Sequence, residues 1–100
     1  MSALAGPIAV TGALGFVASR LIPRLIGRGT TVIAIVRPGR DAARLASAGV
    51  EVRFADLSRP AAHPRAFDGA RAVVHLAGVA QAPGLVPALR GTGVERAVFV

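Results

Sequence analysis

The sequence predicts an α/β fold in which helices cover both faces of a doubly wound parallel sheet. Five short apolar blocks rich in Val and Ile alternate with four segments of helical spacing. Most of these blocks are continuous rather than alternating, as expected of strands that are buried on both faces. Three of the helical segments run into a glycine, which commonly ends a helix.

Strands and helices alternate along the whole chain. The predicted strands span residues 7–11, 31–36, 50–54, 72–77 and 97–100. The predicted helices span residues 15–28, 40–48, 60–68 and 81–92. Because crossovers between parallel strands are right-handed, this alternation predicts the strand order 3-2-1-4-5.

Length and composition limit the function classes. The 100 residues suffice for one domain, residues 1–100, without a linker or a repeat. No apolar run approaches the roughly 18 residues of a membrane span, and residues 1–10 do not resemble a secretory signal. The chain has no cysteine. These features predict a cytoplasmic protein that does not insert into a membrane.

The charge of +7 comes from twelve arginines against five acidic residues, without any lysine. Such a balance permits binding to polyanions. However, the arginines are dispersed, and Arg20, Arg24 and Arg28 follow one face of the first predicted helix. Aromatic residues make up only 4% of the chain, which leaves little to stack on bases. Nucleic acid is therefore not expected as a partner.

A glycine turn joins the first predicted strand to the first predicted helix. The stretch TGALGFVASRL places Gly12, Gly15 and Ala18 at intervals of three. Gly12 would allow a tight turn, Gly15 would let a diphosphate approach the backbone, and Ala18 would let the helix pack closely on the sheet. The backbone around positions 12–17, which includes Leu14, Phe16 and Val17, is expected to converge on that diphosphate. The alternative is that the glycines serve the turn alone.

The same stretch resembles the T-G-x-x-G-x-x-G signature of the extended and atypical short-chain dehydrogenases/reductases. This group includes the NAD-dependent epimerase/dehydratase family and the NmrA-like proteins. The likeness extends through VIAIVRPGR, VEVRFADLSRP, AVVHLAG and GVERAVFV, with Ala18 in place of the third glycine. It implies a Rossmann-type fold that binds NAD or NADP.

Further cofactor residues follow the later strands. The second strand ends in Arg37 rather than a carboxylate, and Arg37 with Arg40 therefore favours NADP over NAD. The alternative is that both are surface charges beside a turn. The resemblance implies that Asp56 and Leu57 lie against the adenine, and that three residues line the cofactor after the fourth strand: Leu76, Ala77 and Gly78.

Local roles remain open for some of these residues. Asp56 or Ser58 could cap the next helix, while Ala77 and Gly78 could simply form a turn. His75 is expected to be packed or hydrogen-bonded rather than catalytic. The few acidic residues and the two histidines of the sequence do not form a pattern that predicts a metal site.

The resemblance implies a catalytic Tyr with a Lys four residues on, but the chain contains neither residue. No residue is therefore expected to be catalytic. We expect the N-terminal portion of a longer oxidoreductase or epimerase/dehydratase that lacks the C-terminal part of the fold. The alternative is an NmrA-like module that senses NADP without chemistry. The terminal edge strand predicts self-association where nothing covers it.

Overall fold

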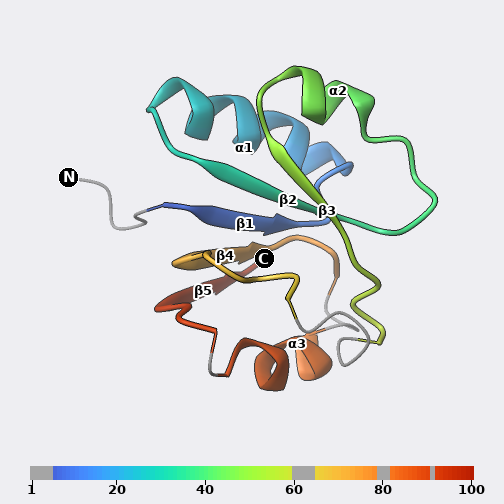
Figure 1. Ribbon diagram of the computed structural model, residues 1–100, viewed down its shortest axis with the longest axis vertical. Helices are drawn as coiled ribbons and strands as arrows, with labels where there is room; N and C mark the ends of the chain where they lie inside the picture. The colour runs from blue at the N-terminus through green and yellow to red at the C-terminus, as the bar shows by residue number, and fades with distance from the viewer. Residues whose placement is uncertain (1–5, 60–64, 79–81, 91) are drawn as a thin grey trace.

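Five parallel strands form one sheet at the centre of the molecule (Figure 1). The computed structural model describes residues 6–59, 65–78, 82–90 and 92–100. The strands are β1 (Ile8–Thr11), β2 (Val32–Val36), β3 (Glu51–Phe54), β4 (Ala72–His75) and β5 (Arg96–Phe99). Their order is β3-β2-β1-β4-β5 with every neighbouring pair parallel, which confirms the predicted topology.

Helices cover the two faces of the sheet. They are α1 (Phe16–Gly27), α2 (Ala43–Ser47) and α3 (Ala82–Leu89), and each lies within a predicted segment. Figure 1 shows α1 and α2 on one side of the sheet and α3 on the other. Within the described residues, no helix is long and apolar enough to cross a membrane.

Glycines end the first two helices, as the sequence predicts. Gly29 has a φ of +78°, and the amide of Thr30 donates to the carbonyl of Leu25 at 3.0 Å. Gly49 ends α2 with the same pattern. The left-handed glycine lets the chain reverse while the last carbonyls of the helix keep hydrogen-bond donors.

The helix predicted over residues 60–68 is wrong where the structure describes this segment. Residues 60–64 lie outside the described residues, and residues 65–69 form consecutive turns. The amide of Asp68 donates to the carbonyl of Arg65 at 3.2 Å, and the amide of Ala70 donates to Phe67 at 3.1 Å. Both bonds span three residues instead of the four of an α-helix.

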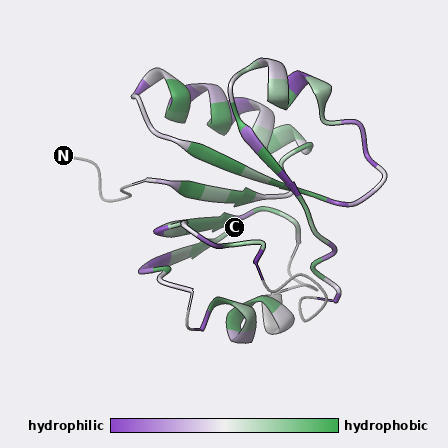
Figure 2. Ribbon diagram, viewed as in Figure 1, coloured by the Kyte–Doolittle hydropathy of each residue, from purple (hydrophilic) through white to green (hydrophobic). Residues whose placement is uncertain are grey.

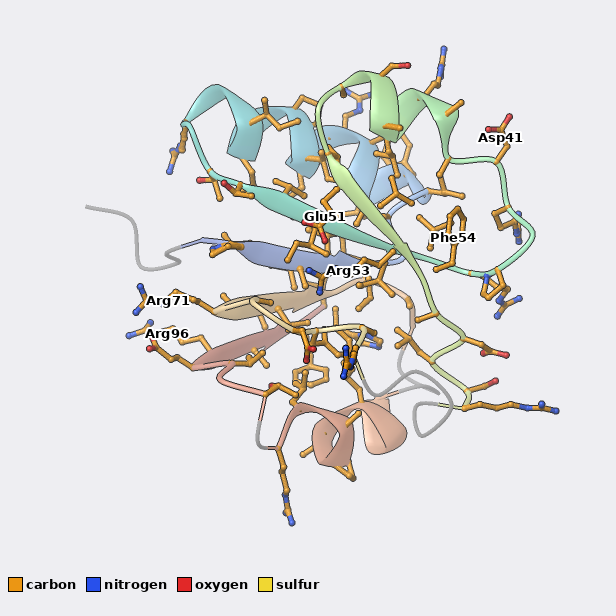
Figure 3. The ribbon with its side chains drawn as sticks, in the orientation of Figure 1. Asp41, Glu51, Arg53, Phe54, Arg71 and Arg96 are labelled. Carbon is orange, nitrogen blue, oxygen red and sulfur yellow. The ribbon has the colours of Figure 1, made fainter. Side chains whose placement is uncertain are left out.

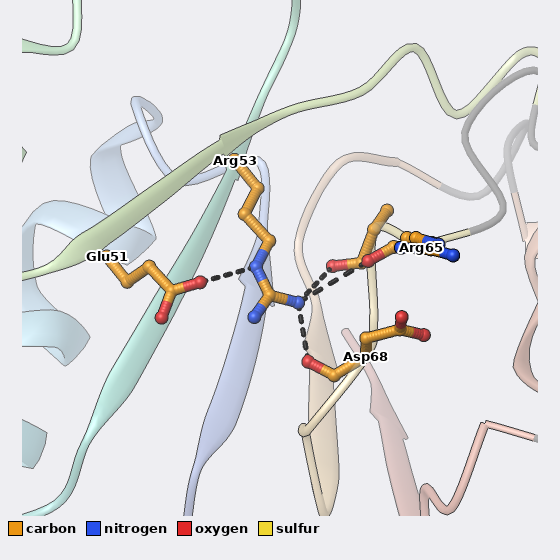
Figure 4. A network of polar contacts seen from close by, with 5 residues as sticks. Glu51, Arg53, Arg65 and Asp68 are labelled. Carbon is orange, nitrogen blue, oxygen red and sulfur yellow. Dashed lines mark hydrogen bonds and ion pairs between the residues drawn. The ribbon is translucent and has the colours of Figure 1, made fainter.

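A side chain from β3 takes the place of helical donors in this segment. The guanidinium of Arg53 donates to the carbonyls of Ala66 at 3.1 Å and Asp68 at 2.6 Å (Figure 4). Figure 3 shows Arg53 and Glu51 among the side chains of the sheet. Its Nε also donates to the Glu51 carboxylate at 2.6 Å. In a helix, these carbonyls would accept hydrogen bonds from backbone amides. Here they accept hydrogen bonds from Arg53, which links the turns to the sheet.

Alternation along the strands divides the core into two layers. Ile8 and Val10 of β1 face α1 and α2, whereas Ala9 faces α3, and all three are fully buried. Figure 2 shows hydrophobic residues along the central strands. At about 1.5–3 kcal/mol for each fully buried Val or Ile, this burial is a major favourable contribution to folding.

Strand β5 is much less covered than its neighbour β4. All four residues of β4 are buried, whereas all four residues of β5 are exposed. β5 pairs with β4 alone and forms one edge of the sheet. The side of β5 that faces away from β4 therefore presents backbone donors and acceptors that have no strand partner in the described structure.

The Arg53 contacts predict that Arg53→Met destabilises the fold by about 1–3 kcal/mol, because carbonyls of the 65–69 turns lose a charged donor. Glu51→Gln, which removes only the exposed ion pair, is expected to cost less than about 1 kcal/mol. Urea denaturation of both variants measures the difference. Equal losses of stability would show that the ion pair, not the carbonyl contacts, carries the effect.

Candidate functional site

A cavity of about 380 Å³ opens at the carboxyl edge of the sheet. Its walls come from the segments that follow four strands. The lining residues are Gly12, Ala13, Leu14 and Gly15 after β1, Ile35, Val36, Arg37 and Arg40 at the end of β2, Ala55 and Leu57 after β3, and Leu76 and Ala77 after β4. The strand order reverses direction at β1, where such crevices hold ligands in doubly wound sheets.

The turn after β1 approaches the backbone after β4 closely. Gly12 has a φ of +63°, and a Cβ built on it would lie 2.8 Å from the carbonyl carbon and oxygen of Leu76. It would also lie 2.9 Å from the amide nitrogen of Ala77. Both the conformation and the space therefore require glycine at position 12.

Helix α1 begins at the turn that lines the cavity. Gly15 is the N-cap, and no side chain caps the helix or adds an acidic group in its first turn. The N–H groups of the first turn and the positive end of the helix dipole are thus available to an anion. A Cβ on Gly15 would lie 3.1 Å from the carbonyl oxygen of Gly12, so the turn is tight here too. Ala18, one turn on, is fully buried between α1 and the sheet.

Two arginines border the cavity beyond β2. Arg37 and Arg40 lie in one turn, where the amide of Arg40 donates to the carbonyl of Arg37 at 3.3 Å. Both residues are exposed, so their positive charges lie at the border between the cavity and solvent.

Asp56 lies beside the cavity but does not line it. Its carboxylate accepts hydrogen bonds from the hydroxyl and the amide of Ser58 at 2.6 and 3.0 Å. These bonds lower the pKa of Asp56, with smaller contributions from Arg37 and Arg59. The carboxylate thus stabilises a local turn, and that turn presents the buried side chain of Leu57 to the cavity.

Buried polar side chains join the ends of β1 and β4. Thr11 and His75 are paired across the two strands and are 0% and 1% exposed. Thr11 Oγ1 lies 2.8 Å from His75 Nδ1 and accepts the amide of Leu76 at 3.0 Å. His75 Nε2 lies 2.7 Å from the carbonyl oxygen of Gly78. His75 is thus hydrogen-bonded at both ring nitrogens.

The cavity gathers eight of the twelve residues that the sequence singles out for a cofactor. The other four, Phe16, Val17, Asp56 and Gly78, do not line it. Phe16 and Val17 are 74% and 52% exposed at the start of α1, with the Arg20 guanidinium carbon 5.1 Å from the centroid of the Phe16 ring.

Within the described ranges, no group of His, Cys, Asp and Glu side chains could hold a metal ion.

Sequence reasoning missed four lining residues: Ala13, Ile35, Val36 and Ala55. Each is small or apolar and therefore looks like ordinary core or turn sequence. Only their positions distinguish them. Val36 is the last residue of a predicted strand and Ile35 precedes it, Ala55 directly follows the next predicted strand, and Ala13 follows Gly12.

Comparison with known proteins identifies related sequences. A sequence model for the group described as "NAD dependent epimerase/dehydratase family" matches residues 8–86. A curated relative, Protein BRI1-5 ENHANCED 1 of Arabidopsis thaliana, is 38% identical over 82 residues, which cover 72% of this chain and 22% of that protein. This chain therefore spans about a fifth of that relative's length.

Solved structures share the fold. Triphenylmethane reductase of Citrobacter sp., complexed with NADP(H), is 33% identical with a TM-score of 0.81, covering 92% of this chain and 36% of that one. An NADPH-dependent quinone oxidoreductase of Escherichia coli, complexed with NADPH, is 29% identical with a TM-score of 0.80, covering 92% of this chain and 35% of that one. The chain spans about a third of each.

The close approach at Gly12 predicts that Gly12→Ala destabilises the protein by more than about 2 kcal/mol, because the methyl group meets backbone atoms at a positive φ. Gly27→Ala is the matched control, since nothing lies within 4 Å of a Cβ there. We expect the control to change stability by no more than about 1 kcal/mol, in the stabilising direction. Thermal or urea unfolding measures both, and a Gly12→Ala variant as stable as the control would contradict the close approach of the two backbones.

Proposed function

Because this chain belongs to the NAD-dependent epimerase/dehydratase family, we propose that it binds a nicotinamide dinucleotide, with NADP(H) preferred and NAD as the alternative. The single observation that carries the proposal is the cavity at the carboxyl edge, where the uncapped start of α1 and the glycine turn meet two arginines. The NADP(H) and NADPH complexes of the two structural relatives support the same cofactor.

The diphosphate of the cofactor would lie against the turn after β1. There Gly12 and Gly15 keep side chains away from the backbone, and the first amides of α1, including those of Phe16 and Val17, donate hydrogen bonds. Leu14 lines the same side of the cavity. A helix N-terminus without an acidic side chain in its first turn favours the negative charge of the diphosphate.

The adenosine half would extend toward β2 and β3. Arg37 and Arg40 would bind the 2′-phosphate of NADP, since the end of β2 offers no carboxylate to a ribose hydroxyl. Leu57 would pack against the adenine, and Asp56 would position Leu57 through its turn with Ser58. The opposite half of the cofactor would follow the segment after β4: Leu76, Ala77 and Gly78.

For the whole protein, we propose a reductase or epimerase/dehydratase reaction whose proton-transfer groups lie outside these 100 residues. Two observations support this proposal. The chain contains no Tyr or Lys, and it matches only about a third of the length of each solved relative. The second candidate is an NmrA-like sensor that binds NADP(H) without turnover. Oxidation of NADPH by the intact protein with a carbonyl or quinone acceptor would favour the reductase over the sensor.

The arginine turn predicts that Arg37→Asp weakens NADPH binding about 10- to 100-fold, because a phosphate partner is replaced by a like charge. NADH affinity is expected to change by less than about threefold, since NADH carries no 2′-phosphate. Fluorescence titration with both nucleotides at fixed ionic strength measures the two affinities.

The matched control is Arg24→Asp, which makes the same charge change at an exposed position on α1 that does not line the cavity. It is expected to leave the preference for NADPH intact. Equal affinity of the unaltered protein for NADPH and NADH would remove the case for phosphate recognition, and so would equal effects of the two substitutions.

The exposed edge of β5 supports a further proposal, that the 100-residue chain self-associates through this strand. Val98→Lys places a charge on the strand and is expected to raise the dissociation constant of the dimer at least about tenfold. Val86→Lys on α3 is the control, because Val86 is also exposed, at 48% against 39% for Val98. Sedimentation of the two variants tests the proposal, and a monomeric unaltered chain would refute it.

A further inference from the structure

The hydrogen-bond partners of His75 assign a proton to its Nε2 atom. A carbonyl oxygen can only accept, so the bond to Gly78 requires a proton on Nε2. In the neutral ring, Nδ1 is then an acceptor, and the Thr11 hydroxyl donates to it. Thr11 Oγ1 in turn accepts the amide of Leu76. Every donor in this buried group has an acceptor, and within the described residues no buried side-chain polar atom lacks a partner.

These bonds hold the segment after β4 at both of its ends. The Leu76 amide is bound to Thr11, and the Gly78 carbonyl is bound to His75. Between them lie Leu76 and Ala77, which line the cavity and face the turn at Gly12. The geometry of this wall relative to the glycine turn therefore depends on the two buried side chains.

The ring of His75 is itself held in place. The Phe99 ring lies 5.4 Å from it between centroids, at an interplanar angle of 55°. The amide of Val100 donates to the His75 carbonyl at 3.2 Å. One face of the imidazole is thus packed against a β5 side chain, and the backbone of His75 is bonded to the end of β5.

We propose that His75 is a positioning residue for the dinucleotide: its Nε2–H tautomer ties the carbonyl of Gly78 to β4 and pre-forms the Leu76–Ala77 wall of the cavity before the cofactor binds. The inference rests on the proposed function, because it assigns the wall to a dinucleotide. Pre-forming a site raises affinity by lowering the ordering cost of binding.

Two substitutions separate the two ring nitrogens. Asn places its amide near the position of Nδ1 and keeps a partner for Thr11 but does not reach Gly78. Gln extends to the position of Nε2 and can still donate to the Gly78 carbonyl. We expect His75→Asn to raise the dissociation constant of NADPH about tenfold and His75→Gln to raise it less than about threefold. Circular dichroism shows the temperature range in which both variants are folded.

Nitrogen-15 NMR of the imidazole provides a readout that needs no variant. The unaltered chain is expected to show the Nε2–H tautomer without cofactor and to keep it when saturated with NADPH. An Nδ1–H tautomer, or a change of tautomer on binding, would overturn the proposal. So would variants that lose affinity equally.

Backbone amide NMR spectra distinguish failure of the inference from failure of the proposed function. If the unaltered chain binds no NADPH, the proposed function fails. The Ala77 and Gly12 amide resonances still test the wall, because His75→Asn is expected to shift them and His75→Gln to leave them in place. Unchanged resonances in His75→Asn would refute a positioning role whether or not the cofactor binds.

Discussion

The arrangement of the site depends on one contact, the approach of the backbone after β1 to the backbone after β4. Gly12 lies so close to the Leu76–Ala77 peptide that no side chain fits between them. Because β1 is central in the sheet, β2 and β4 flank it and their following segments diverge on either side. The close contact on the β4 side leaves the cavity open toward β2 and β3, where both arginines lie. The tight turn thus sets how far the cavity extends toward the segment after β4, whose residues Leu76 and Ala77 form its wall on that side.

The parallel sheet and its order could be predicted from the sequence because burial on both faces leaves a plain signal. Blocks such as residues 31–36 are apolar without alternation, and a glycine follows each of the first two helices. The segment before β4 could not be predicted in the same way. Its helical spacing is real, but Arg53, which is 12 or more residues away in sequence, binds its carbonyls and holds it as turns. Local pattern does not record such a distant donor.

The lining of the cavity could be predicted in part for a related reason. Glycine lowers stability between a strand and a helix unless the backbone needs it, and arginine carries a charge. Gly12, Gly15 and Arg37 could therefore be singled out in the sequence. Ile35 and Ala55 line the same cavity but resemble core residues. The roles of the arginines also differ in ways that composition hides. Arg53 is bound to carbonyls, whereas the Arg37 and Arg40 side chains are exposed beside the cavity. The net charge of +7 therefore says less about a ligand than the position of two of its twelve basic side chains.

Stability alone does not explain why Thr11 and His75 occupy the ends of two central strands. The rest of β1 and β4 is apolar and buried, and replacing a buried polar pair by apolar groups of similar shape is often neutral or stabilising. What an apolar pair could not do is bind the Leu76 amide and the Gly78 carbonyl, which have no strand partner beyond the end of β4. The polar pair thus keeps the backbone after β4 in a fixed position beyond the last hydrogen bonds between the strands. That segment forms a wall of the cavity, where a fixed backbone matters most for a bound ligand.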